Sequence, residues 1–208
     1  MAIIHRAELR PSKLELLAGW VPGRPWGVAA ALEQVGAYRF DDPAGEVGVE
    51  TFVLRAGGVL LHVPLTYRGA PAPAQAAHLV GTLEHSVLGR RWVYDACGDP
   101  VYVAAALTGA PQAEELVVTD GRQERREPTA RVGGSGVAGD AGPLGDLTVT
   151  DSADATTVRT GGLELVVRRV LDPAATADGA AALAGTWAGQ DRPVLLATAR
   201  RVQPSPVA

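Results

Sequence analysis

"ETFVLRAGGVLLHVPLTYRG", residues 50–69 of the 208-residue chain, carries the clearest hairpin signal in the sequence. Gly57 and Gly58 suit a two-residue turn whose central residues both have positive φ. The register set by this turn places four apolar side chains on one face of the strands, the pattern of a half-buried antiparallel sheet: Phe52, Leu54, Leu61 and Val63. His62 falls on the opposite, more polar face, where we expect it to face solvent or to be partly covered.

A helix before this hairpin and a second strand pair after it have clear local signals. Ser12 and Glu15 have the spacing of a capping box at the start of "PSKLELLAGW" (11–20), which predicts a helix. "HLVGTLEHS" (78–86) and "RRWVYDA" (90–96) predict two strands joined by a short turn. The first part of the chain therefore combines an antiparallel sheet with a packed helix.

The second part of the chain differs in composition from the first. Residues 121–146 begin with a charged run and continue into a glycine-rich stretch with little to bury, which predicts a flexible linker. Residues 147–203 contain short runs of β character separated by turn residues, although the alanine-rich stretch at 180–188 suits either a helix or a strand. The tail at 204–208 is expected to fray. The sequence predicts an α+β protein with a first domain at 1–120.

Bulk composition limits the class of protein. Hydrophobic residues make up 47% of the chain, which is ordinary for a folded soluble protein. The net charge of −4 argues against nucleic acid as a partner. Cys97 is the single cysteine, so no internal disulfide forms. Without a signal-peptide pattern or a long apolar run, we expect a cytoplasmic protein with no membrane contact.

Three stretches resemble the N-terminal cap of bacterial maltokinases: "LLAGWVPGRPWG" (16–27), "VLLHVPLTYRG" (59–69) and "WVYDACGDPVYVAAAL" (92–107). The most distinctive part is the YDA-x-x-DP element at 94–100. The resemblance covers roughly residues 10–110. It implies a curved antiparallel sheet with packed helices, in a protein linked to maltose metabolism.

A wider resemblance, carried by residues 40–50 and 84–96, is to a stand-alone actinobacterial version of the cap. Proteins of this type are often labelled 1,4-alpha-glucan branching protein.

The resemblance also bears on kinase chemistry. Residues 147–172 are similar to the first strands of a kinase N-lobe, and the match places Leu165 where the family carries its phosphate-binding lysine. A turn at Gly161-Gly162 would pair Leu165 with Val158 on an apolar face. About forty residues follow, too few for a catalytic lobe, so we expect no kinase chemistry and no cofactor.

Eight residues form the candidate ligand or partner surface. The acids near residue 41 suit a turn with solvated carboxylates, or alternatively a loop that contacts carbohydrate or metal. The histidines lack metal-ligand spacing, and we expect no metal site. Near residue 85, a histidine beside arginines suits a small anionic or sugar ligand, while the tryptophan there suits sugar stacking or core filling. The candidates are Asp41, Asp42, Glu46, His85, Arg90, Arg91, Trp92 and Asp95.

The two aspartates of the YDA-x-x-DP element have different predicted roles. Asp99 precedes Pro100 and is expected to cap the helix that starts there. Asp95 has no helix end to cap, and if it is structural we expect it to pair with Arg90 or Arg91.

The sequence favours a non-catalytic accessory or regulatory protein of α-glucan, maltose or trehalose metabolism. It would bind a partner enzyme or a sugar through the cap-like domain, an inference by analogy with the family. Two alternatives stay open. One is a branching-related enzyme of glucan metabolism, although nothing in the sequence supplies the barrel of such enzymes. The other is a structural protein that assembles through exposed sheet edges.

Overall fold

The central hairpin forms as predicted. The computed structural model describes residues 1–119, 122–137, 144–178 and 180–202. Strands β4 (Gly48–Ala56) and β5 (Val59–Arg68) pair with Leu54 opposite Leu61 and Phe52 opposite Val63. The φ angles at the turn, 53° and 85°, are those that glycine adopts without strain.

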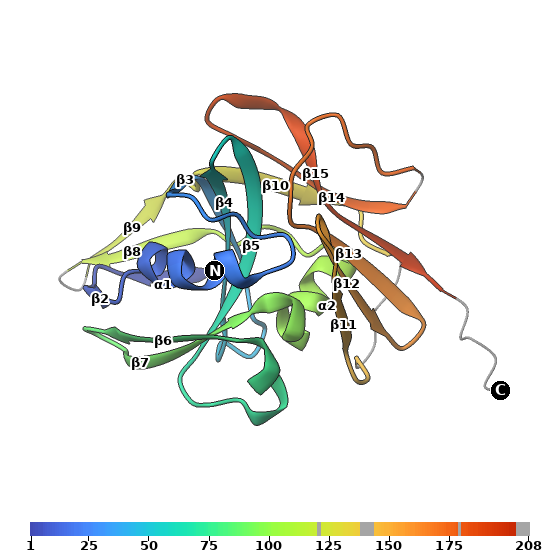
Figure 1. Ribbon diagram of the computed structural model, residues 1–208. Coiled ribbons are helices and arrows are strands. Elements are labelled where there is room, and N and C mark those ends of the chain that lie inside the picture. The colour runs from blue at the N-terminus through green and yellow to red at the C-terminus, as the bar shows by residue number, and fades with distance from the viewer. Residues whose placement is uncertain (120–121, 138–143, 179, 203–208) are drawn as a thin grey trace.

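The hairpin lies within a curled, antiparallel six-stranded sheet, the cap sheet (Figure 1). Its strand order is β2-β6-β7-β5-β4-β3. The other four strands are β2 (Leu9–Arg10) and β3 (Leu32–Phe40) at the edges, with β6 (Leu79–His85) and β7 (Gly89–Asp95) between β2 and β5. The strand pair predicted after the hairpin is therefore β6 and β7, which extend the sheet beyond β5.

Two α-helices pack against opposite faces of the cap sheet. Helix α1 (Lys13–Trp20) has the predicted capping box, and Leu17 lies in a buried cluster with Phe52 and Leu54. Helix α2 (Pro100–Thr108) is capped by Asp99, as predicted. Short 3-10 turns occur at Val21–Gly23, Pro73–His78 and Ala96–Gly98.

A second antiparallel six-stranded sheet lies beyond α2 (Figure 1). Its order is β10-β14-β15-β13-β12-β11. The strands are β10 (Ala130–Gly134), β11 (Thr148–Asp151), β12 (Ala155–Thr160), β13 (Leu163–Arg168), β14 (Ala181–Trp187) and β15 (Gln190–Arg201). The stretch at 180–188, left open between helix and strand, contains strand β14.

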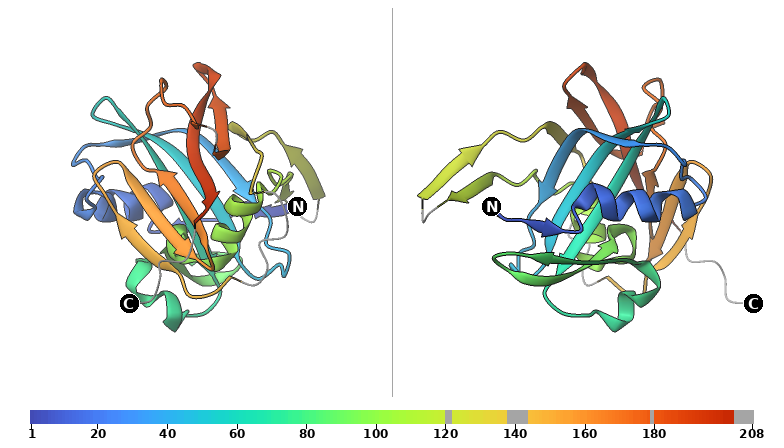
Figure 2. Two further views of the ribbon diagram at one scale, coloured as in Figure 1. Left: turned by 90° about the vertical axis from the view of Figure 1, so that its right-hand side faces the viewer. Right: turned by 60° about the vertical axis from the view of Figure 1, so that its left-hand side comes forward.

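A third, three-stranded sheet joins the start of the chain to its middle. Strand β1 (Ala2–His5) runs parallel to β8 (Glu115–Thr119), which pairs with β9 (Arg122–Arg126). The β8–β9 hairpin extends from the body of the molecule in the right-hand view of Figure 2. All five side chains of β9 are exposed.

The two larger sheets share one hydrophobic core, with α2 between them (Figure 1). Tyr102 of α2 lies in the same buried cluster as Phe40 of the cap sheet and Leu196 of the second sheet. Gly36 of β3 marks a close approach, because a Cβ there would lie 3.1 Å from the Cβ of Trp187. A larger side chain at this position would push the sheets apart.

A short main-chain segment connects the second half of the chain to the cap sheet. Strand β5 pairs with β7 only from Leu65 onward, which leaves its first half without a strand partner on that side. Residues 169–171 cover this edge: His62 N–H donates to Arg169 O (2.9 Å), and Leu171 N–H donates to Leu60 O (2.8 Å). The segment after β13 thus protects an edge that would otherwise be open to other chains.

The linker prediction for 121–146 is wrong over much of its length, because β9 and β10 lie within it. Composition describes side chains, whereas these strands form through main-chain pairing, β9 with β8 and β10 with β14. Residues 138–143 of the predicted linker and 204–208 of the predicted tail lie outside the described residues. The division into domains at 1–120 and 147–203 remains a prediction about independent folding.

His62 also differs from its predicted position. The polar face of the central hairpin is covered by α2 and the second sheet, so His62 is fully buried. Its Nδ1–H donates to Arg168 O (3.0 Å), and its Nε2 accepts from the Tyr38 hydroxyl (2.9 Å). Burial lowers the His62 pKa to about 3. Strand alternation alone could not reveal this second buried layer. Over the described residues the molecule is mostly β, with α1 and α2 as its α-helices.

Candidate functional site

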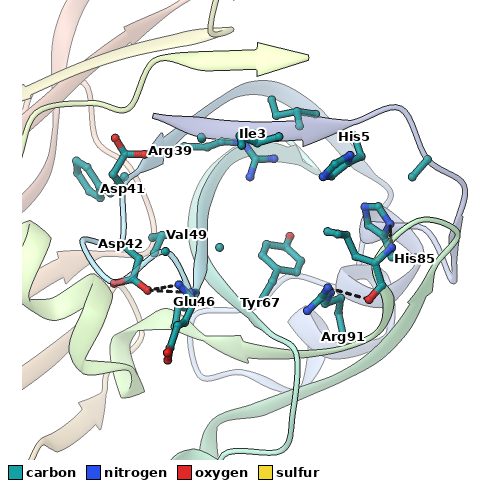
Figure 3. Close-up of a pocket in the computed structure, with 18 of the residues that line it drawn as sticks. Ile3, His5, Arg39, Asp41, Asp42, Glu46, Val49, Tyr67, His85 and Arg91 are labelled. Atoms are coloured by element: carbon teal, nitrogen blue, oxygen red, sulfur yellow. Dashed lines mark hydrogen bonds between the residues drawn. The ribbon is translucent and has the colours of Figure 1, made fainter. Parts of the chain in front are cut away.

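A pocket of about 460 Å³ opens between β1 and the cap sheet (Figure 3). This volume is within the range of small-molecule sites. Its walls come from β1 and the segment after it, the end of β3, the loop at 41–47 and the facing ends of β4 to β7. Segments far apart in the sequence therefore enclose a single space.

The pocket brings together five of the eight predicted site residues: Asp41, Asp42, Glu46, His85 and Arg91. They come from the loop after β3 and from the β6–β7 hairpin, so only the fold makes them neighbours. Figure 3 shows Tyr67 between these two groups. The other three candidates, Arg90, Trp92 and Asp95, do not line this space.

In the acidic loop at 41–47, the side chain of Asp42 stabilises the turn, whereas that of Glu46 is exposed. Asp42 accepts hydrogen bonds from the backbone N–H groups of Ala44, Glu46 and Val47 at 2.8–3.0 Å, so its carboxylate fixes the turn. Asp41 contacts the amino group of Met1. Glu46 is exposed and has no ion pair among the described residues. The turn predicted here is thus confirmed for Asp42.

A charged cluster lies beside Tyr67. Glu50 is buried and pairs with Lys13, with a Nζ to Oε2 distance of 2.5 Å, and with Arg39. Burial opposes ionisation of Glu50, but Arg39 and Lys13 outweigh it and hold the Glu50 pKa below its usual value. Burial also lowers the Lys13 pKa, against the opposing effect of Glu50. The Lys13 ammonium lies 5.3 Å from the centroid of the Tyr67 ring, a cation–π contact.

Two histidines and an arginine line the opposite end. His5 and His85 meet edge to face, with ring centroids 6.2 Å apart. His85 Nδ1 accepts from Val87 N–H (3.2 Å) and Leu88 N–H (3.1 Å). Burial, followed by the nearby His5 and Arg91, lowers the His85 pKa. The histidine therefore favours its neutral form, with the proton on Nε2.

Arg90 and Trp92 flank Arg91 on β7 and project to the other face of the strand. Arg90 is exposed and pairs with Glu84 (2.6 Å). Trp92 is half-buried and lies opposite Thr82 on β6. The predicted surface is therefore divided between two faces, and only Arg91 of this trio belongs to the pocket.

The predicted pairing of Asp95 with Arg90 or Arg91 is wrong. Asp95 is buried and accepts two hydrogen bonds from Arg169 Nη2, at 2.6 and 2.5 Å. Its Oδ1 also accepts from Cys97 N–H (3.1 Å) and caps the 3-10 turn Ala96–Gly98, so the expectation that Asp95 has no helix end to cap is wrong as well. Arg169 Nε also donates to Thr156 Oγ1 (2.7 Å), and its guanidinium lies 4.7 Å from the Trp26 ring centroid. Asp95 is thus a contact between the two sheets. The partner lies 74 positions away, beyond what strand spacing reveals.

Asp99 does more than its predicted helix cap. Its Oδ1 accepts from Val101 N–H (3.1 Å), and its two oxygens accept from Arg68 at 2.9 Å. Thr66 Oγ1 donates to Oδ2 (2.9 Å). The YDA-x-x-DP element therefore joins β7, α2 and β5 through Asp99 and joins the two sheets through Asp95.

Sequence reasoning missed the four other described residues with polar side chains that line the pocket: His5, Lys13, Arg39 and Tyr67. Lys13 is the only lysine of the chain, and Tyr67 lies in a stretch that resembles the cap family, but neither fact assigns a position in space. Among the described residues, no group of three or more His, Cys, Asp or Glu is arranged to hold a metal ion. Across the same residues, no helix has the length and apolar character needed to cross a membrane.

The position expected to carry a kinase lysine has the predicted surroundings. Leu165 pairs with Val158 between β13 and β12, and both side chains lie in the shared core. Gly161 and Gly162 form the turn with positive φ. A hydrocarbon side chain at this buried position offers no donor to a phosphate.

Comparison with known proteins identifies part of the chain. No curated protein matches the sequence. The family model of the maltokinase N-terminal cap domain matches residues 20–99. This range begins at the end of α1 and reaches the Asp99 cap of α2, so it contains the central hairpin and most walls of the pocket. The protein therefore carries a maltokinase-cap-like domain.

Proposed function

We propose that this protein is a non-catalytic accessory or regulatory protein of α-glucan, maltose or trehalose metabolism, and that it binds a sugar in the pocket of its cap-like domain. One observation carries the proposal. Side chains that the sequence marks as candidates, from 41–46 and 85–91, converge on one pocket of about 460 Å³. The cap-domain match is consistent with a maltose-related context.

The lining has the chemistry that a hydroxyl-rich ligand needs. Carboxylates such as Asp41 and Glu46 accept hydrogen bonds from sugar hydroxyls, and Arg91 and His85 donate to them. The Tyr67 ring adds an aromatic surface within the same lining. A pocket with a few convergent polar groups on an apolar base is the usual form of a small-molecule site.

A role in binding rather than catalysis is supported by the second sheet. We propose that β11 to β13 correspond to the start of a kinase N-lobe, with Leu165 where the lysine would lie. Leu165 is buried among apolar neighbours, so this position offers no cation to a nucleotide phosphate.

Docking of a partner enzyme is a second candidate, favoured by exposed apolar residues near the pocket. Val87 and Leu88 at the tip of the β6–β7 hairpin are 56% and 45% exposed, and Ile3 of β1 is 53% exposed. A sugar in the pocket and an enzyme docked beside it would thus be close enough for binding of one to change the affinity for the other.

Calorimetric titration with maltose, trehalose and maltotriose tests the sugar proposal. We expect measurable binding of at least one of these sugars, weakened about tenfold in the Asp41→Asn/Glu46→Gln double variant. The amides keep an acceptor oxygen but lose the charge that strengthens the hydrogen bonds, and a combined loss of about 1.4 kcal/mol corresponds to tenfold. Glu84→Gln is the matched control, since Glu84 is an exposed acid outside the pocket. No heat of binding with any of the three sugars would contradict the proposal.

A further inference from the structure

Three nitrogen-bearing side chains meet at the end of the pocket away from the acidic loop: His5 of β1, His85 of β6 and Arg91 of β7 (Figure 3). The His5 and His85 rings are 6.2 Å apart between centroids. Each side chain comes from a different strand, so the fold itself assembles the cluster. No carboxylate of the described pocket lining lies on these strand ends.

Arg91 has no carboxylate partner among the described residues. By contrast, its neighbour Arg90 pairs with Glu84, and Arg39 in the same pocket pairs with Glu50. One hydrogen bond, from Arg91 Nη2 to Leu88 O (2.8 Å), holds the guanidinium in place. Its Nε is buried without a hydrogen-bond partner. Most of the five N–H donors of this guanidinium are therefore unused within the part of the chain that the structure describes.

The backbone leaves room for this guanidinium. Gly69 lies beside it, and a Cβ at Gly69 would be 2.7 Å from Arg91 Nη1. The bond to Leu88 O fixes the side chain along the β6–β7 turn. A charged group that is already held in position loses less conformational entropy when it binds a ligand.

His85 supplies a second donor next to Arg91. Its Nδ1 accepts two backbone N–H groups of the hairpin turn, so its proton is on Nε2. Nε2 makes no hydrogen bond to any described residue. The turn therefore orients the ring and leaves one N–H donor for a ligand.

We propose that His5, His85 and Arg91 form a subsite for the anionic group of the ligand, a phosphate or carboxylate carried by a sugar. The inference rests on the proposed function, since the rest of the sugar would occupy the space toward Tyr67 and the acidic loop. Charge-assisted hydrogen bonds from arginine to such oxygens are among the strongest in proteins.

The charge distribution also orients this ligand. Asp41, Asp42 and Glu46 line the other end of the pocket and repel an anionic group. The Lys13 ammonium lies 5.3 Å from the centroid of the Tyr67 ring, and Glu50 neutralises part of the charge of Lys13 and Arg39. An anionic sugar thus has one favourable direction, with its hydroxyl groups toward the carboxylates and its charged group toward Arg91.

Calorimetric titration of the full chain with four probes tests this subsite: glucose, glucose 6-phosphate, glucuronate and inorganic phosphate. We expect the two anionic sugars to bind at least tenfold more tightly than glucose. The comparison between them distinguishes phosphate from carboxylate as the preferred group. Arg91→Gln should remove this preference, whereas Arg90→Gln, on the same strand and facing away from the pocket, should retain it. Melting temperatures of both variants close to that of the wild type show that both are folded.

The outcomes separate the subsite from the proposed function. Equal affinity for glucose and both anionic sugars, unchanged in Arg91→Gln, would overturn the anionic subsite and leave sugar binding in place. Binding of phosphate that depends on Arg91, without binding of any sugar, would support the subsite and contradict the sugar proposal. An anionic preference lost equally in Arg90→Gln would place the subsite elsewhere and overturn the assignment.

Discussion

At the scale of single residues, a few buried polar groups hold the two sheets together. Arg169 is fully buried and binds Asp95, Thr156 and the face of Trp26. A buried ion pair gives little net stability compared with an apolar replacement, but it is costly to break, because one charge is then left without a partner. The YDA-x-x-DP element at 94–100, which most resembles the cap family, thus contains Asp95, a residue that links the two sheets.

Asp95→Ala should lower the free energy of unfolding by roughly 3–5 kcal/mol, the usual cost of leaving a buried charge unpaired. Glu84→Ala breaks the exposed Arg90–Glu84 pair and should cost no more than about 1 kcal/mol. Urea unfolding of both variants measures the difference. Equal costs for the two substitutions would show that Asp95 does not anchor the second sheet.

His62 makes stability depend on pH. Its pKa is about 3 in the folded protein and about 6.5 when unfolded, so the unfolded chain binds more protons between these values. Stability from the neutral ring is therefore complete above the unfolded pKa and is lost as pH falls toward 3. Between pH 7.5 and pH 5.0 we expect a loss of about 2 kcal/mol in urea unfolding.

His62→Gln is the control for this effect, because glutamine does not titrate. Its free energy of unfolding at pH 7.5 should be lower than that of the wild type, owing to the lost bonds to Tyr38 and Arg168 O. The decrease between pH 7.5 and pH 5.0 should be much smaller than in the wild type. The same decrease in both proteins would assign the pH dependence to other groups.

At the scale of elements, local signals and long-range pairings differ in how well the sequence predicts them. The capping box at Ser12, the Asp99 cap and the glycine turn at 57–58 were all predictable, because each depends on neighbouring residues. The pairing of β1 with β8 and of β10 with β14 was not, since the partners are separated by long stretches and β10 resembles a linker in composition. The pairing of residues 169–171 with β5 is likewise long-range and was not predictable from the sequence.

Amide hydrogen exchange tests whether this segment is part of the stable core. The amides of His62 and Leu171 donate across the junction, to Arg169 O and Leu60 O. We expect both to exchange only through global unfolding, as the slowest amides of β4 and β5 do. The amides of Val87 and Leu88, in the exposed hairpin turn, should exchange much earlier. Exchange of His62 and Leu171 at the rate of this turn would show that the junction opens independently.

At the scale of the whole molecule, one hydrophobic core spans both sides of the predicted linker. Buried residues of the cap sheet, α2 and the second sheet form a single cluster.

The pocket, like the strands, depends on both local and long-range contacts. Five of its residues were predictable as polar groups in turn and hairpin segments, but the fold had to bring them together with Lys13, Tyr67 and β1.

Limited proteolysis tests this shared core. Trypsin should cut first at Arg122, Arg125 or Arg126, because β9 is exposed and lies at the edge of its sheet. The nicked protein should still elute as a single particle in size-exclusion chromatography. Separate elution of the two fragments would show that the halves are independent domains joined by a linker.

Above all, we propose that the cap-like domain binds a sugar in the pocket beneath β1. The most direct test is the change in backbone amide chemical shifts during titration with maltose and with glucose 6-phosphate. We expect the shifted amides to cluster in residues 1–9, 40–49 and 83–91, with larger shifts near Arg91 for the phosphorylated sugar. Shifts confined to the Gly161-Gly162 turn of the second sheet, or no shifts with either sugar, would contradict sugar binding in this pocket.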